Sequence, residues 1–276
     1  MHLYIIPLML SSTHGKNSTR YMPWDSPSYH PEWSYRVEFW GQYMHLYIIP
    51  PLCYLQPMAR IARVICPGIP HHITQRGNRR QSTFFCDDDY LAYIELLAEW
   101  CGKCGVTIWA WCLMPNHVHL IAVPQAETSL ARALGEAHRR YTRRINFREN
   151  WRGHLWQERF ASFPMDESHL LAAVRYVEMN PVAAGLAANP AEYRWSSAAA
   201  HLEGAADLLA GASPLQDMIS NWSVFLRLST DDELENLKQH ERTGRPLGSG
   251  GFVEEMEKKT GRILRPQRPG PKKNDG

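Results

Sequence analysis

The chain has 276 residues, of which 44% are hydrophobic and 21% are charged, with a formal net charge of +2. This is the composition of a globular protein with enough chain for a sizeable core. Total charge therefore gives no argument for nucleic-acid binding, and no run approaches the roughly 18 apolar residues of a membrane span. The six cysteines form no disulfide framework typical of secreted proteins, so we expect reduced thiols and a cytoplasmic protein.

The first 57 residues differ from the rest of the chain. The heptad MHLYIIP occurs at 1–7 and again at 44–50, and a Pro-, Ser- and aromatic-rich stretch without clear period separates the copies. Two copies of a heptad do not make a repeat fold. We expect residues 1–57 to be an extension outside the working domain, either disordered or the result of a start assigned too early, with Met58 as the natural start.

From Met58 to residue 201 the pattern becomes regular and predicts one domain. Asp87–Asp89 suit a helix start, Pro115-Asn116 is a turn signal between two β-rich runs, and Asn180-Pro181 is expected to end the last helix. The order β-α-β-β-α-β predicts an α+β, ferredoxin-like antiparallel sheet with one added helix. The expected strands are at 71–75, 106–114, 117–123 and 158–165. The expected helices run from Asp87 to Gly102 or Gly105, over 128–148, and from Asp166 or Ser168 to Asn180.

Two of these helices carry apolar stripes that should face the sheet. The first stripe is Leu91, Ile94, Leu97 and Ala98; the second is Leu130, Leu134, Ala137, Tyr141 and Ile145. Beyond residue 201, residues 202–276 predict an accessory region with a helix near 230–240, a second short helix and a basic tail. That tail has seven Lys or Arg among residues 258–273, and we interpret it as a phosphate-binding arm.

The stretch LMPNHVHLIAV places two histidines two positions apart on a predicted strand. Side chains alternate along a strand, so His117 and His119 point to the same face and can share one metal ion. On the last helix, Tyr176 and Asn180 are one turn apart on one side. If that side faces the histidines, two imidazoles and an amide oxygen can hold a divalent cation while the phenol of Tyr176 attacks a phosphate.

Other residues of the same types have plainer interpretations. Tyr141 is a rival nucleophile, but its place in an apolar stripe predicts a core residue. His71 and His72 are adjacent on a strand, so they point in opposite directions and cannot both face one metal ion in the same manner. The C-x-x-C pair Cys101 and Cys104 lacks a second pair for zinc, so we expect unpaired thiols.

Four segments together are similar to the single-tyrosine HUH transposases, closest to the REP-associated tyrosine transposases and their IS200-like relatives. They are MARIARVICPGIPHHITQRGNRRQSTFF, WCLMPNHVHLIAV, LWQERFASFPM and YVEMNPVAAGL. The resemblance implies that His117 and His119 bind Mg²⁺ or Mn²⁺, that Asn180 takes the third-ligand position where some members have Gln, and that Tyr176 is the nucleophile. It also implies cutting of single-stranded DNA beside a hairpin, through a 5′-phosphotyrosine intermediate.

DNA-binding residues are expected in cationic stretches. One is the QRGNRRQ loop, another the basic helix at 128–148, and the third the tail. Two other functions remain open: a non-catalytic nucleic-acid-binding module of ferredoxin-like fold, and a metal phosphoesterase that uses water. Oligomeric state is left open, with a homodimer among the options. The residues expected to contact DNA are Arg76, Arg79, Arg80, Arg132, Arg139, Arg140, Arg143 and Arg144.

Overall fold

The computed structural model describes residues 34–39, 42–47, 61–228 and 231–266. The chain divides into two units, residues 1–55 and residues 56–276. In the first unit, the described residues form two paired antiparallel strands, β1 (Ser34–Phe39) and β2 (Gln42–Tyr47). The rest of the predicted 1–57 extension lies outside the described residues.

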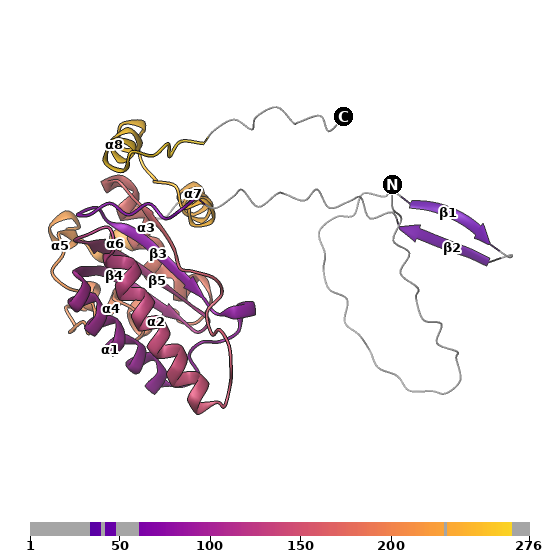
Figure 1. Ribbon diagram of the computed structural model, residues 1–276, viewed down its shortest axis with the longest axis horizontal. Helices are drawn as coiled ribbons and strands as arrows, with labels where there is room; N and C mark the ends of the chain where they lie inside the picture. The colour runs from indigo at the N-terminus through magenta and orange to yellow at the C-terminus, as the bar shows by residue number, and fades with distance from the viewer. Residues whose placement is uncertain (1–33, 40–41, 48–60, 229–230, 267–276) are drawn as a thin grey trace. The chain divides into compact units, whose positions relative to one another are not determined.

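Four antiparallel strands form the sheet of the second unit (Figure 1). Their order across the sheet is β4-β5-β3-β6, so the first strand of this unit lies between its third and fourth. A helix connects β3 to β4 and another connects β5 to β6. This is the β-α-β-β-α-β ferredoxin-like arrangement, and the predicted α+β fold is confirmed. The strands are β3 (His71–Arg76), β4 (Val106–Met114), β5 (His117–Pro124) and β6 (Ala161–Pro164).

The two connecting helices, α1 (Asp87–Cys104) and α2 (Ser129–Arg148), pack with each other and against one face of the sheet. The stripe predicted for α2 is buried throughout. The stripe predicted for α1 is partly wrong, because Leu91 is 37% exposed and Ala98 is also exposed. The helix is turned so that its aromatic side reaches the core instead. Tyr90 and Tyr93 are buried there, and both rings pack on the Phe84 ring.

The opposite face of the sheet is covered by α3 (Glu167–Ala183). The helix begins at Asp166, whose side chain accepts a hydrogen bond from the His169 backbone N–H. The predicted end at Asn180-Pro181 is wrong, since α3 continues through Pro181 to Ala183. Pro181 has no N–H to donate to the carbonyl four residues earlier, so the helix loses one hydrogen bond at this position. The Ala184 N–H then donates to the Asn180 carbonyl and completes the last turn.

The C-terminal region belongs to the same unit and folds onto the domain. Three short helices that the sequence did not predict, α4 (Ala198–Glu203), α5 (Leu215–Met218) and α6 (Trp222–Leu226), are too brief to show a helical period. The helix α7 (Asp231–Thr243) contacts α3 and β6, and α8 (Gly250–Thr260) packs its Met256 beside Val64 and Leu264. None of the described helices is long and apolar enough to cross a membrane. The described cysteines are all free thiols.

Candidate functional site

Strand register gathers a group of histidines on the face of the sheet that α3 covers. Arg76 of β3 pairs with His117 of β5, and Thr74 pairs with His119. His72 lies two residues before Thr74 on the same face, so it is the diagonal neighbour of His119. The register therefore builds the site from the middle two strands of the sheet, where the backbone is held on both sides.

The two histidines of β5 lie side by side, as their spacing predicted. Their ring centroids are 4.9 Å apart, and the rings are inclined at 78°. His119 is 1% exposed, and His117 is half-buried with its Nδ1 atom 2.6 Å from Asn116 Oδ1. Burial lowers the pKa of His117 to about 4 and holds the pKa of His119 well below its usual value. Both imidazoles are therefore neutral at pH 7, the form in which histidine binds metals.

Helix α3 brings Tyr176 and Asn180 to these histidines. The Tyr176 ring centroid lies 5.2 Å from that of His119, and Asn180 Nδ2 lies 3.4 Å from His119 Nε2. The Asn180 side chain also interacts with Tyr176 and lowers the pKa of its hydroxyl. Tyr176, Asn180 and His117 are only partly buried. The structure thus brings together the four side chains predicted as a site, on the predicted face of α3.

The hydroxyl of Tyr176 is protonated at neutral pH. Burial raises the pKa of Tyr176 to about 12, and the nearby Glu241 carboxylate contributes in the same direction. The Asn180 side chain and the charge of Arg76 both lower this pKa. A phenol in this state needs a cation or a base before it can act as a nucleophile.

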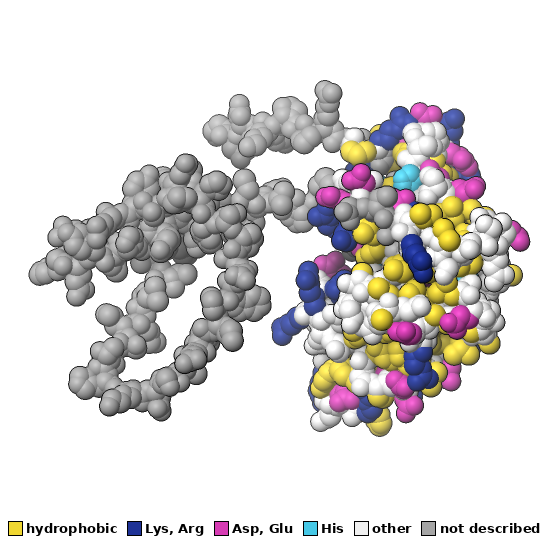
Figure 2. All heavy atoms as spheres, turned by 180° about the vertical axis from the view of Figure 1, so that it is seen from behind, with side chains coloured by type: hydrophobic (Ala, Val, Ile, Leu, Met, Phe, Trp, Pro, Cys, Tyr) yellow, Lys and Arg dark blue, Asp and Glu magenta, His cyan; other side chains and the backbone are white. Residues whose placement is uncertain are grey.

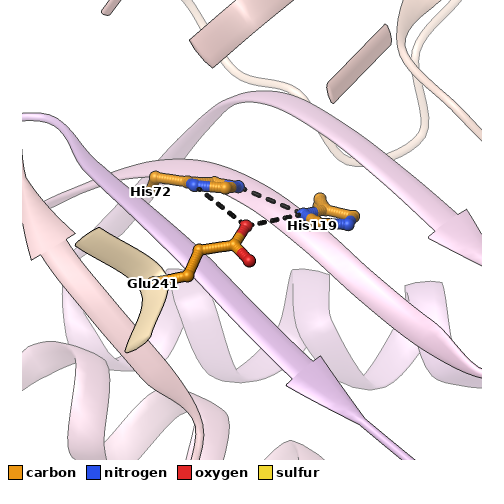
Figure 3. A group of neighbouring side chains, drawn as sticks. All are labelled: His72, His119 and Glu241. Carbon is orange, nitrogen blue, oxygen red and sulfur yellow. Dashed lines mark hydrogen bonds and ion pairs between the residues drawn. The ribbon is translucent and has the colours of Figure 1, made fainter. Parts of the chain in front are cut away.

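Two side chains at the site were missed from the sequence, His72 and Glu241 (Figure 3). His72 Nε2 lies 3.1 Å from His119 Nδ1, and Glu241 Oε1 lies 3.7 Å from His72 Nδ1 and 3.9 Å from His119 Nδ1. The three are of residue types that hold metal ions. Strand alternation does send His71 and His72 to opposite faces, but that same alternation puts His72 on the face of His119. Glu241 comes from α7, and no local pattern places it there.

The arginines predicted to bind DNA fall into two groups. Arg76, Arg79 and Arg80 are exposed next to the site, and the Arg80 carbonyl accepts a hydrogen bond from Asn116, the residue before His117. The α2 arginines are exposed on the opposite side of the sheet. There Arg139 and Arg140 pair with Glu136. The structure does not bring this second group, Arg132, Arg139, Arg140, Arg143 and Arg144, to the histidines.

Basic side chains do not form one continuous surface on the face shown in Figure 2, where Lys and Arg are interspersed with Asp and Glu. Part of the predicted basic tail is used within the protein. Arg262 donates to the carbonyls of Ala62 and Arg63, and Arg265 pairs with Glu254. Arg268, Lys272 and Lys273 lie outside the described residues.

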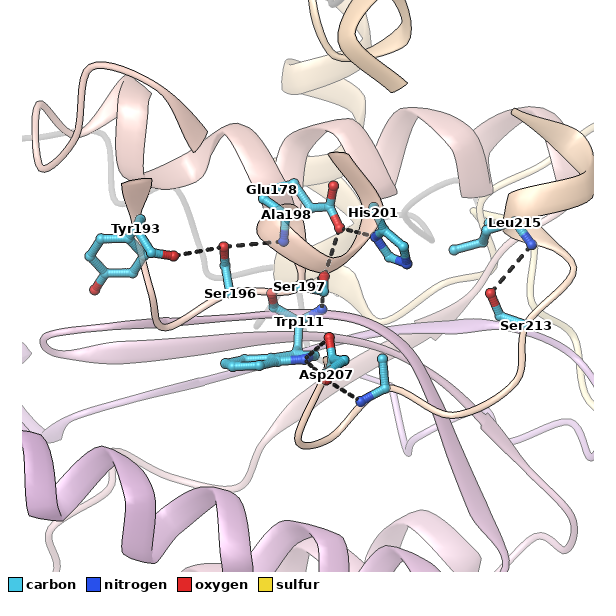
Figure 4. A network of polar contacts seen from close by, with 11 residues as sticks. Trp111, Glu178, Tyr193, Ser196, Ser197, Ala198, His201, Asp207, Ser213 and Leu215 are labelled. Carbon is cyan, nitrogen blue, oxygen red and sulfur yellow. Dashed lines mark hydrogen bonds and ion pairs between the residues drawn. The ribbon is translucent and has the colours of Figure 1, made fainter. Parts of the chain in front are cut away.

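A buried polar network fixes α3 from its other side (Figure 4). Glu178 is fully buried, and its Oε1 accepts hydrogen bonds of 2.6 Å from Ser197 Oγ and His201 Nδ1. Ser197 Oγ also accepts from the backbone N–H of Trp111 on β4. Because Glu178 is two residues from Tyr176, this network sets the position of the tyrosine-bearing turn against the sheet.

Strand order and side chains together define the class of protein: a ferredoxin-like domain in which an H-x-H pair on the sheet faces a tyrosine on an added helix. Residues 67–180 match the family model described as IS200-like transposase. Over residues 67–180, the predicted resemblance to this family is confirmed. The match supports a transposase-type function on DNA.

No curated protein matches the sequence. Among solved structures, one similar protein is a REP-associated tyrosine transposase bound to a REP hairpin, with 19% identity and a TM-score of 0.47. That likeness covers 56% of this chain and 93% of the other. Another is described as a "putative transposase" from Deinococcus radiodurans R1, with 21% identity and a TM-score of 0.32, covering 43% and 95%.

Proposed function

We propose that this protein is a single-stranded DNA endonuclease and strand transferase that forms a covalent 5′-phosphotyrosine through Tyr176. The observation that carries the proposal is that the Tyr176 ring lies beside the His117–His119 pair. Asn180, one turn further along the same helix, also reaches His119. The expectation of a hairpin beside the cut comes from the resemblance to REP-associated transposases.

The residues present fit a divalent cation such as Mg²⁺ or Mn²⁺. His117, His119 and the amide oxygen of Asn180 are the ligands we propose, because two neutral imidazoles and one oxygen leave coordination positions open. Such a cation, when bound, would polarise a phosphate and offset its developing charge. His72, His119 and Glu241 are a second set of the right types that shares His119 with the first.

The chemistry at Tyr176 is a phosphoryl transfer. The Tyr176 oxygen forms a bond to the phosphorus, and the bond from phosphorus to the 3′ oxygen of the preceding nucleotide breaks. The phenolic proton is lost to solvent, and the departing 3′ oxygen takes up a proton to give a free 3′-OH. Because the ester keeps the energy of the broken bond, a second 3′-OH can later attack the phosphorus, rejoin DNA and release the tyrosine.

The place of Tyr141, on the side of the sheet away from the histidines, argues for Tyr176 as the nucleophile. Tyr141 is fully buried, and its hydroxyl donates to the Thr83 carbonyl at 2.7 Å.

Both faces of the sheet carry helices, α1 and α2 on one and α3 on the other. A module that stacks nucleic-acid bases on an open sheet would need one face free of helices.

The test is incubation of a labelled single-stranded DNA hairpin with the full-length protein and Mn²⁺. We expect a covalent protein–DNA product that survives denaturation, absent in Tyr176→Phe and retained in the matched control Tyr141→Phe. Cleavage without a covalent product would indicate a phosphoesterase that uses water. Binding without cleavage would indicate a non-catalytic nucleic-acid-binding module.

A further inference from the structure

His72 and His119 face each other edge to edge through their ring nitrogens. Their ring planes are within 11° of each other, and the centroids are 5.3 Å apart while His72 Nε2 and His119 Nδ1 are 3.1 Å apart. A metal ion between two such nitrogens would need roughly 2.0–2.1 Å to each of them. The 3.1 Å gap is too short for an ion on the line between them and is right for a hydrogen bond.

One proton must therefore lie between these two nitrogens. A neutral imidazole has one N–H and one acceptor nitrogen, so two arrangements are open. In the first, His119 Nδ1–H donates to His72, and His119 Nε2 keeps its lone pair on the side of Asn180. In the second, His72 Nε2–H donates, and His119 carries its hydrogen on Nε2, where it blocks a cation.

Glu241 favours the first arrangement. Its Oε1 atom is 3.7 Å from His72 Nδ1, a distance at which the attraction is electrostatic rather than a full hydrogen bond. His72 is fully buried, and its Nδ1 makes no hydrogen bond within the described part of the chain. A carboxylate at this place stabilises an N–H on Nδ1 and repels a lone pair there. His72 Nε2 must then be the acceptor, and His119 Nδ1 the donor.

We propose that His72 and Glu241 are positioning residues that hold His119 in the tautomer whose Nε2 can bind the cation. This inference rests on the proposed function in one respect, that His119 is a metal ligand. Histidine ligands usually donate their other ring N–H to a neighbour, which fixes the orientation of the ring and raises the basicity of the nitrogen that binds the metal. Here the neighbour is a second imidazole, and a carboxylate from α7 fixes that imidazole in turn.

His71 supplies the matched control for His72. It is the adjacent residue, it is equally buried, and its ring points to the other face, where Nε2 accepts from the Cys66 backbone N–H. Glu235 supplies the control for Glu241, because it is an exposed glutamate on the same helix. Each control loses the same type of side chain without changing Glu241, His72 or His119.

The first measurement is Mn²⁺ affinity of the full-length protein without DNA, by electron paramagnetic resonance. We expect His72→Phe to weaken binding about 10- to 100-fold and Glu241→Leu by about tenfold. His72→Gln should stay within a few-fold of wild type, because its amide oxygen can still accept from His119. Affinity in His71→Phe and Glu235→Leu should be unchanged.

The second measurement is the tautomer of His119, read from ¹⁵N shifts of the metal-free, histidine-labelled protein. We expect hydrogen on Nδ1 in the wild type and a shift toward Nε2 in Glu241→Leu, which a merely structural role for Glu241 would not produce.

Wild-type affinity and tautomer in both the Glu241→Leu and the His72→Phe variants would overturn the proposal. So would loss of Mn²⁺ binding in His72→Phe with full binding in His117→Ala, since the ion would then lie at His72 itself. A wild-type protein that shows the expected tautomer and affinity but never forms a DNA adduct would refute the proposed function and leave this inference standing.

Discussion

The two faces of the sheet hold the same residue types in different states. On the α1–α2 face, the Tyr93 hydroxyl and His138 Nε2 are 2.8 Å apart, and both side chains are buried. On the α3 face, Tyr176 and His119 are also neighbours, but Tyr176, His117 and Asn180 are partly exposed. In the first pair, the polar atoms satisfy each other. In the second, a hydroxyl and ring nitrogens remain within reach of a ligand.

The pKa values follow this difference. Burial raises the pKa of Tyr93 and Tyr141 far above the usual value for tyrosine, so neither can ionise under ordinary conditions. The pKa of Tyr176 rises only to about 12. A tyrosine beside a histidine is therefore no sign of catalysis by itself. What distinguishes the α3 face is partial access together with a second imidazole.

The largest expected effect separates the histidines of the two faces. His119→Ala should reduce cleavage by roughly 100-fold or more, because loss of a cation removes several kcal/mol of charge stabilisation. It should leave hairpin binding close to wild type, since arginines carry most of the affinity. His117→Ala should behave alike, whereas His138→Ala should lower stability and spare the cleavage rate of the folded protein. Single-turnover rates and hairpin-binding isotherms measure both quantities, and normal cutting by His119→Ala would refute the metal assignment.

The second prediction concerns metal removal. Mn²⁺ at about 100 times its Kd should stabilise the wild-type protein by about 2.7 kcal/mol, because the ion binds the folded state. The gain should vanish on addition of a chelator and in His117→Ala. The free energy of unfolding, from urea titrations with and without Mn²⁺, gives the comparison. An equal gain in His117→Ala would place the ion elsewhere.

The third prediction asks whether DNA reaches both faces. Replacing Arg76, Arg79 and Arg80 by alanine should lower the slope of log binding constant against log salt by up to about 2, at roughly 0.7 for each phosphate contact of a single strand. The pair Arg139→Ala with Arg143→Ala should lower it by up to about 1.4 if DNA also contacts α2. Binding measured over a salt series decides this, and an unchanged slope for the pair would confine DNA to the α3 side.

The smallest expected effect concerns stability on the closed face. Burial lowers the pKa of His138 to about 3, whereas the unfolded chain should titrate near 6.5. The stability from neutral His138 is therefore complete above pH 6.5 and is lost as pH falls toward 3, by at most about 1.4 kcal/mol per pH unit. His138→Leu should cost about 1–3 kcal/mol at pH 7.5, because Tyr93 loses its partner. The stability of His138→Leu should fall less between pH 7.5 and pH 5.0 than that of the wild type, which urea unfolding at the two pH values measures. An equal fall would mean that His138 does not titrate as stated.

Sequence periodicity predicted the sheet, the helices that cover it and the shared side of Tyr176 and Asn180 on their helix. Each of those features repeats within one element, so a few residues are enough to show it. The exposed Leu91 shows the limit, because the helix turns toward its aromatic side for reasons of packing that lie in other elements.

Features that depend on contacts between distant segments could not be predicted in this way. His72 and His119 are 47 positions apart, and the strand register that makes them diagonal neighbours is set by the whole sheet. Glu241 is further away in the sequence still. It lies on α7, which the sequence predicts to be a helix without showing where that helix packs. The continuation of α3 through Pro181 is accompanied by backbone hydrogen bonds beyond the proline, from Ala184 to the Asn180 carbonyl and from Leu186 to the Pro181 carbonyl.

The position of α7 bears on any attempt to shorten this protein. The stretch that matches the family stops at residue 180, three residues before α3 ends, and Glu241 stands on a helix well beyond it. A fragment trimmed to that stretch would lack both the last turn under the tyrosine and the carboxylate that faces His72. We expect a shortened protein that keeps the complete site to need the chain at least through Thr243.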